Sequence, residues 1–257
     1  TRIAVLSELP DEWETRAARW LERARGCCDG EHCPTPNDLY LLFQTLLGAW
    51  PLTGEPDATF RDRIDTYMRK AMREAKVSTS WTRPDDGYEQ GMTQTIHGLL
   101  DDLAFRADLA DLAHHLTPYG ACNSLAQVAV KLASPGVPDI YQGTELWDLS
   151  LVDPDNRRPV DYRSRETALT AVSGRPADPG RLADDGVGHG KLWIVQRTLA
   201  TRARVLECFD AATPSGGYEP LSIDGSGARH AVAFRRGERV VVAGVRLPLG
   251  LERAGGW

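Results

Sequence analysis

The sequence predicts an α/β protein that is predominantly helical. Through much of the chain before residue 133, apolar residues recur at helical spacing. One short run, Val137–Tyr141, has the composition of a strand and ends in Gln142-Gly143 before a polar loop. Beyond Phe209, alternating apolar residues replace the helical spacing. The 257 residues are enough for one or two domains.

The N-terminal segments carry the clearest helix signals. Glu12–Arg25 repeats its apolar residues at helical spacing and is ended by Gly26. Thr35-Pro36-Asn37-Asp38 is a start signal, with Thr as the cap, Pro in the first turn and an acid three residues on. Further helices are expected over Phe60–Ala75, over Leu99–Leu116 as one or two helices, and over Asn123–Leu132. The polar side of Phe60–Ala75 and the residue after it carry Arg69, Arg73 and Lys76, a basic stripe typical of a solvated face.

After Tyr162 we expect a helix, a linker, a second helix and a hairpin. Arg163–Val172 and Lys191–Phe209 are the predicted helices, and Gly174–Gly190, rich in Gly, Pro and Asp, is the predicted linker. Ala231–Arg235 and Arg239–Ala243 alternate like strands. Gly237-Glu238 between them suits a two-residue type II′ turn.

Composition restricts the partners. The chain has 30 basic and 36 acidic residues, a net charge of −6, and no basic stripe that favours a nucleic acid. The apolar run Val240–Val245 is too short to cross a membrane, and the first residues lack the pattern of a signal peptide. We expect a cytoplasmic protein with no nucleic-acid partner, no membrane partner and no cofactor.

Five cysteines are present, and their spacing suggests no disulfide framework. Cys27, Cys28, His32 and Cys33 lie close together, which raises the question of zinc. Cys27 and Cys28 are adjacent and lack the two-residue gap that lets both thiolates reach one ion. We therefore expect no metal site, and reduced, structurally incidental thiols.

The segment from Ser134 to Tyr162 is the most informative part of the chain. Glu145, Trp147 and Asp148 follow the predicted strand, at the end where an α/β barrel builds its active site. A turn signal, Asp153-Pro154-Asp155-Asn156, precedes Arg157 and Arg158, whose guanidinium groups can clamp carboxylates or bridge hydroxyls. These residue types fit a pocket for a neutral, hydroxyl-rich ligand. The alternative is a surface loop held by Asp–Arg pairs.

This segment also carries a resemblance to a known family. Pro135–Glu145 (P-G-V-P-D-I-Y-Q-G-T-E) resembles the eighth barrel strand of the α-amylase family. The continuation L-W-D-L-S-L-V-D-P-D-N-R-R-P-V-D-Y resembles the maltooligosyltrehalose synthases within that family. Further segments are similar to the same family: Arg2–Glu8, Tyr40–Pro51, Arg73–Lys76 and Thr79–Trp81. The resemblance extends from Arg2 to about Val245.

The resemblance implies the C-terminal part of a TIM (β/α)8 barrel with a mostly helical inserted subdomain and an incomplete C-terminal β domain. The implied divisions are a barrel segment over 1–33, the helical insert over 34–120, the last strand and helix of the barrel over 121–175, and a linker, helix and truncated β domain over 176–257.

The resemblance also implies that the chain is a fragment of a longer protein. The chain begins at Thr1, without an initiator Met. The family's catalytic carboxylates lie on earlier barrel strands, so they are expected upstream of Thr1, and no catalytic residue is expected within the chain. The partner would be the missing N-terminal barrel portion, and the fragment alone would be inactive.

The implied activity is that of an isomerase, an intramolecular transfer that converts the reducing-end α-1,4 linkage of a maltooligosaccharide into the α,α-1,1 linkage of trehalose. The residues expected to bind this substrate are Lys76, Trp81, Tyr141, Glu145, Trp147, Asp153, Asp155, Asn156, Arg157 and Arg158. The alternatives are a hydrolase of the α-amylase family and a noncatalytic helical binding module. The sequence also leaves Glu145 and Asp148 open as reacting groups.

Overall fold

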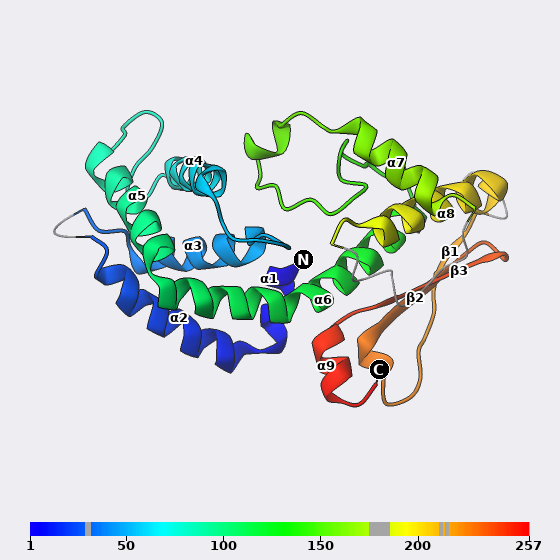
Figure 1. The fold of residues 1–257 in the computed structure, drawn as a ribbon. Helices are drawn as coiled ribbons and strands as arrows, with labels where there is room; N and C mark the ends of the chain where they lie inside the picture. The colour runs from blue at the N-terminus through cyan, green and yellow to red at the C-terminus, as the bar shows by residue number, and fades with distance from the viewer. Residues whose placement is uncertain (29–31, 175–185, 211–212, 214–215, 257) are drawn as a thin grey trace. The chain divides into compact units, whose positions relative to one another are not determined.

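The fold was analysed in a computed structural model, which describes residues 1–28, 32–174, 186–210, 213 and 216–256. The chain is mostly helical, as predicted (Figure 1). It divides into two compact units. The N-terminal unit comprises Arg2–Thr117 and Leu149–Pro159, and the C-terminal unit comprises Pro118–Asp148 and Val160–Trp257, together with Thr1. Each unit is described by itself.

The N-terminal unit is built from helices. They are α1 (Arg2–Val5), the short 3-10 helix η1 (Leu6–Glu8), α2 (Pro10–Arg25), α3 (Pro36–Ala49), α4 (Ala58–Ala75), α5 (Asp86–Asp101) and the first part of α6 (Leu103–Ala133). The predictions of α2, α3 and α4 are confirmed. The cap predicted for α3 is also present, since the side chain of Thr35 accepts a hydrogen bond of 3.2 Å from the backbone N–H of Asp38.

Aromatic side chains fill the core of this unit. The indole of Trp20 on α2 is fully buried. It meets the ring of Phe43 on α3 edge-on at 5.6 Å between centroids, and that of Phe105 on α6 at 5.4 Å. Each such fully buried side chain stabilises the fold by about 1.5–3 kcal/mol. These contacts join α2 to the next helix, α3, and to α6, which is distant in the sequence.

Helix α6 continues without interruption where the sequence predicted separate helices. It includes Pro118, which removes one backbone donor and normally ends or kinks a helix. Apolar side chains are buried on both sides of it, including Leu112 and Leu116 before it and Val128 and Leu132 after it. This burial outweighs the lost hydrogen bond. At Pro118 the chain also passes from the N-terminal into the C-terminal unit.

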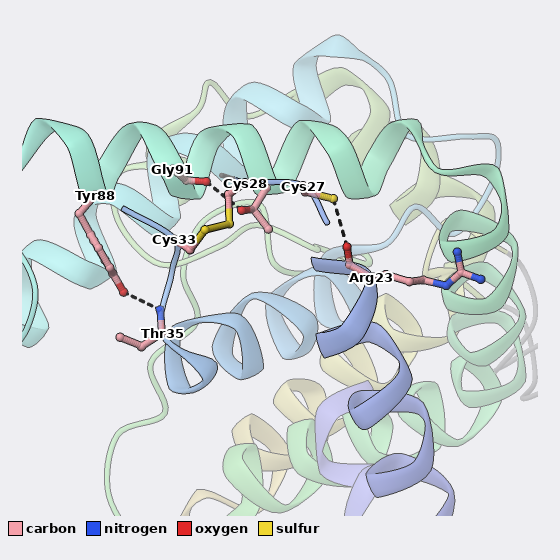
Figure 2. Close-up of a disulfide and its surroundings, with 8 residues drawn as sticks. Arg23, Cys27, Cys28, Cys33, Thr35, Tyr88 and Gly91 are labelled. Carbon is pink, nitrogen blue, oxygen red and sulfur yellow. Dashed lines mark hydrogen bonds between the residues drawn. A yellow bond between two sulfur atoms is a disulfide. The ribbon is translucent and has the colours of Figure 1, made fainter. Parts of the chain in front are cut away.

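The cysteine prediction is wrong for two residues, because Cys28 and Cys33 are joined by a disulfide (Figure 2). Sequence alone could not reveal that their Cα atoms lie 5.6 Å apart. The disulfide-bonded segment packs on α5 at Gly91, where an added Cβ would lie 2.0 Å from the backbone oxygen of His32. The side chain of Tyr88, also on α5, accepts a 2.9 Å hydrogen bond from the backbone N–H of Thr35. Within the described residues, no cluster of three or more His, Cys, Asp or Glu side chains could hold a metal ion.

The C-terminal unit combines helices with a small antiparallel sheet. After α7 (Tyr162–Val172) and α8 (His189–Arg204) come the strands β1 (Tyr218–Pro220), β2 (Ala231–Arg236) and β3 (Val240–Val245), in that order in the sheet, and then α9 (Pro248–Arg253). The short 3-10 helices η4 (Leu206–Cys208) and η5 (Ala228–His230) precede β1 and β2, and η2 (Asp155–Arg157) belongs to the N-terminal unit. Both predicted strands of the hairpin and the helix α7 are confirmed. The helix predicted over Lys191–Phe209 is confirmed in part, because α8 ends at Arg204 and the separate 3-10 helix η4 follows.

Two sequence predictions differ in this unit. Arg236 pairs with Val240, so the hairpin loop has three residues, 237–239, rather than two. The other difference is Val137–Tyr141, the expected strand, which lies outside any helix or strand, with Val137 96% and Tyr141 64% exposed. A strand needs a neighbour to pair with, and the described residues offer this segment none. Most of the predicted linker, 175–185, lies outside the described residues.

Of the helices that the structure describes, none combines the length and the apolar character that crossing a bilayer requires.

Candidate functional site

The predicted site residues are distributed over both units. Tyr141, Glu145 and Trp147 belong to the C-terminal unit. The N-terminal unit holds the others, namely Lys76, Trp81, Asp153, Asp155, Asn156, Arg157 and Arg158.

A pocket of about 540 Å3 follows the end of α4. Its lining consists of Lys76, Ser80, Trp81, Thr82 and Arg83. The indole of Trp81 is 57% exposed, unusual for so large an apolar group. The pocket therefore offers a flat apolar surface beside an ammonium group and hydroxyls, and it contains two of the residues that the sequence predicted to bind a sugar.

Lys76 takes a backbone conformation that normally belongs to glycine. It caps the C-terminus of α4 at φ 59°, in the left-handed region, and its backbone N–H donates to the carbonyl of Met72 at 3.2 Å. A residue with a Cβ is disfavoured there by about 1–2 kcal/mol. Local strain of this kind points to a role for the side chain.

Trp81 lies against a guanidinium group. The Arg73 guanidinium carbon is 5.0 Å from the centroid of the indole, within range of a cation–π contact. Arg73 in turn donates to both carboxylate oxygens of Glu89, at 2.6 and 2.7 Å. Glu89 lies on α5 and is only 5% exposed. The bonds from Arg73 hold the pKa of Glu89 below its ordinary value. The sequence suggested that Arg73 lies on a solvated basic face. In the structure Arg73 is instead paired with the buried Glu89 carboxylate.

The loop between α4 and α5 is fixed at its base. Thr79 donates to Glu89 at 2.8 Å and accepts from the backbone N–H of Asp85 at 2.9 Å. Ser80 and Arg83 close a turn, with the Ser80 N–H on the Arg83 carbonyl at 3.1 Å and the Arg83 N–H on the Ser80 hydroxyl at 3.0 Å. The turn presents Trp81 and Thr82 at its tip.

The Asp–Arg loop, 149–159, is bound to α4. Arg63 donates to the two carboxylate oxygens of Asp155 at 2.8 and 2.9 Å, and the Leu151 N–H donates to the same carboxylate at 2.7 Å. Burial opposes ionisation of Asp155, but these bonds prevail and hold its pKa below the ordinary value. The Asp155 carboxylate is thus engaged within the protein, as the alternative of a loop held by Asp–Arg pairs requires. A sugar contact by Asp155 stays a prediction.

The rest of this loop is less buried. Asp153 pairs with Arg157, and its carbonyl accepts from Lys70 of α4 at 2.7 Å. Arg158 donates to the Ser150 hydroxyl at 2.8 Å. Asn156 is exposed. These side chains remain candidates for hydroxyl contacts because much of their surface is open to solvent.

In the C-terminal unit, Trp147 is held by a segment distant in sequence. Its backbone N–H donates to the carbonyl of Val187 at 3.0 Å. The Lys191 ammonium lies 5.9 Å from its ring centroid and donates to the Leu146 carbonyl at 3.2 Å. Glycine is required at 188, where φ is +106° and a Cβ would lie 2.5 Å from the Trp147 nitrogen. Trp147 is therefore well positioned and half-buried.

The other predicted residues of this unit differ from Trp147. Tyr141 is exposed. One carboxylate oxygen of Glu145 lies 3.4 Å from Arg165 Nε, but neither of these two buried atoms forms a hydrogen bond. The Tyr162 hydroxyl donates to the side-chain oxygen of Gln142 at 2.7 Å.

No family model matches the chain. Curated relatives do: the putative maltooligosyl trehalose synthases of two strains of Mycobacterium tuberculosis, CDC 1551 / Oshkosh and H37Rv, are each 37% identical over 257 residues, which is 99% of this chain. Along its whole length the chain is thus a homologue of part of the maltooligosyltrehalose synthases. It spans 30% of the length of these relatives. The placement of the catalytic carboxylates upstream of Thr1 stays a prediction.

Solved structures of maltooligosyltrehalose synthases also match the chain. A crystal structure of a maltooligosyl trehalose synthase matches 95% of this chain with a TM-score of 0.83 and 28% identity, over 31% of its own length. The maltooligosyltrehalose synthase from Arthrobacter ramosus matches 100% of the chain with a TM-score of 0.80 and 36% identity, again over 31% of its own length. The resemblance drawn from the sequence motifs is confirmed.

Several residues of the site were not found from the sequence. The resemblance to maltooligosyltrehalose synthases pointed to Lys76 and Trp81, but not to Glu89, and Arg73 was assigned to a solvated face. Glu89 lies between two apolar positions of α5, Tyr88 and Met92. An acid on the buried side of a helix needs a cation as partner. The position of Glu89 on the buried side of α5 was therefore the signal in the sequence that could have indicated a pairing with a cation.

Proposed function

We propose that the chain forms the substrate-holding part of an enzyme that converts the reducing-end α-1,4 linkage of a maltooligosaccharide into the α,α-1,1 linkage of trehalose. The pocket that holds Lys76 and Trp81 supports this most directly. An indole stacks on the apolar face of a pyranose ring, and an ammonium group donates to its hydroxyls. A neutral glucan requires no complementary net charge.

The reaction we propose retains the α configuration. A carboxylate attacks the anomeric carbon of the last α-1,4 linkage while a carboxylic acid protonates the departing oxygen, and these groups stand about 5–5.5 Å apart. The released glucose then turns and attacks the anomeric carbon of the glycosyl-enzyme through its own anomeric hydroxyl. This hydroxyl gives its proton to the group that had protonated the departing oxygen, the bond between sugar and enzyme breaks, and the attacking carboxylate is regenerated. Water must be excluded, because hydrolysis would yield only glucose and a shortened glucan.

The reacting carboxylates belong, in this proposal, to a portion of the enzyme upstream of Thr1, a TIM barrel that Val137–Tyr141 would complete as a strand. The lack of a ladder partner for this segment among the described residues and the 96% exposure of Val137 support this role. We also propose that the enzyme acts in the cytoplasm.

Mixing experiments test the proposal. The chain is combined with a separately produced preceding portion and supplied with maltopentaose. We expect reducing ends to disappear on mixing, with little release of glucose and no reaction by either piece alone. Turnover by this chain alone would show that the reacting groups lie within it, and stoichiometric glucose release would indicate a hydrolase instead.

A further inference from the structure

We infer that Glu89 and Arg73 are positioning residues of the pocket. Glu89 fixes Arg73 against one face of Trp81, so that a glucosyl unit stacks only on the other face. This inference rests on the proposed function, since it concerns how the same pocket orients a saccharide.

The contact between Arg73 and Trp81 places a cation where a sugar would otherwise stack. The guanidinium carbon is 5.0 Å from the ring centroid, which leaves no room for a pyranose on that side. The indole is nevertheless 57% exposed, so a stacking surface remains. An aromatic side chain with two open faces could bind a ring in either of two poses, whereas one with a single open face determines the pose.

Glu89 determines where Arg73 lies. Its bidentate pairing with Arg73, at 2.6 and 2.7 Å, fixes the plane of the guanidinium group. Arg69 Nε stands 3.6 Å from the same carboxylate. A lysine in place of Arg73 could keep the charge but not this planar geometry.

Glu89 also fixes the base of the loop that carries Trp81. Thr79 donates to it at 2.8 Å and in turn accepts from Asp85, so both ends of the segment between them depend on one carboxylate. The positions of the Trp81 indole and of the Arg73 guanidinium group therefore both depend on the Glu89 carboxylate. A buried ion pair is by itself weak evidence that the pair stabilises the fold. Here Arg73 and Thr79 both bind the Glu89 carboxylate, and this fits a role in positioning the indole and the guanidinium group.

The test compares Glu89→Gln and Arg73→Met with two controls in the full chain. Asp101→Asn removes the Arg61–Asp101 pair, which also joins α4 to α5, at 2.6 Å. Ile64→Val shortens a fully buried side chain of α4 and so controls for a loss of stability alone. Two signals are followed: the Kd for maltopentaose by calorimetry, and the fluorine NMR resonance of Trp81 in 5-fluorotryptophan-labelled protein, assigned with Trp81→Phe.

We expect Glu89→Gln and Arg73→Met to weaken maltopentaose binding about five- to tenfold and to shift or broaden the Trp81 resonance, with both controls unchanged. Arg73→Lys should restore part of the affinity. Wild-type affinity in Glu89→Gln and Arg73→Met, or an equal loss in Ile64→Val, would overturn the inference. If the wild type binds no maltopentaose, the proposed function fails and the sugar-orienting role with it. An unmoved Trp81 resonance in Glu89→Gln overturns the positioning role on its own.

Discussion

Replacing Lys76 by glycine should make the protein more stable while weakening its sugar binding. Lys76 adopts φ 59° at the C-terminus of α4, where a Cβ is unfavourable by about 1–2 kcal/mol. Glycine removes this penalty but adds about 0.4–1 kcal/mol of chain entropy to the unfolded state. The difference predicts a gain of roughly 0.5–1 kcal/mol in the unfolding free energy of the N-terminal unit.

The binding effect has the opposite sign. Glycine deletes the ammonium group from the pocket, and a hydrogen bond that involves a charged group contributes about 1.5–3 kcal/mol. We therefore expect the Kd for maltopentaose to rise about 10- to 100-fold. Stability is measured by urea denaturation followed by circular dichroism, and affinity by calorimetry.

Lys76→Ala separates the two effects. Alanine keeps the backbone penalty and loses the ammonium group, so it should bind as weakly as the glycine variant without the gain in stability. Undiminished maltopentaose affinity in both variants would refute a binding role for Lys76. A glycine variant no more stable than the alanine variant would refute the argument from backbone strain.

Three further predictions concern stability. Arg73 holds the pKa of Glu89 below its ordinary value in the folded protein. The ionised carboxylate therefore stabilises the fold fully above the pKa that Glu89 has in the unfolded chain, and this stabilisation is lost as the pH falls through its pKa in the folded protein. Urea denaturation should thus show stability falling below about pH 4, less steeply in Glu89→Gln. Asp155→Asn should cost roughly 2 kcal/mol, and limited proteolysis should then cut loop 149–159 faster; an unchanged cleavage rate would contradict its anchoring by Arg63. Gly91→Ala should cost about 1–2 kcal/mol by denaturation, because its Cβ meets backbone. Gly87→Ala meets only the exposed His32 ring and should cost nothing, so equal losses would argue against the close packing.

Helices α2, α3 and α4 were predictable because their signals are local. The apolar spacing of α2 and the Thr35 cap of α3 each depend on residues within one or two turns. The continuity of α6 through Pro118 was not predictable, because it depends on apolar burial on both sides of the proline. The expected strand at Val137–Tyr141 failed for a related reason, since strand formation depends on a pairing partner elsewhere.

The sequence named two side chains that lie together in one pocket, but not the residues that support them, and their sugar contacts stay a prediction. Lys76 and Trp81 line a common pocket, as the family resemblance suggested. The pairing of Arg73 with Glu89 joins two helices, and no local pattern specifies which acid a given arginine meets. The Cys28–Cys33 disulfide was missed because bonding depends on how closely the chain brings two Cα atoms together, which spacing alone does not reveal.

Helix α4 supports two loops, the one between α4 and α5 and loop 149–159. Arg63 and Lys70 hold loop 149–159, Arg73 lies against Trp81, and Lys76 lines the pocket that follows the helix. Each loop can therefore change in length or composition without displacing the other, provided that α4 keeps its register. Relatives that accept different glucans would then be expected to vary in the loops and to preserve the spacing of these basic residues along the helix.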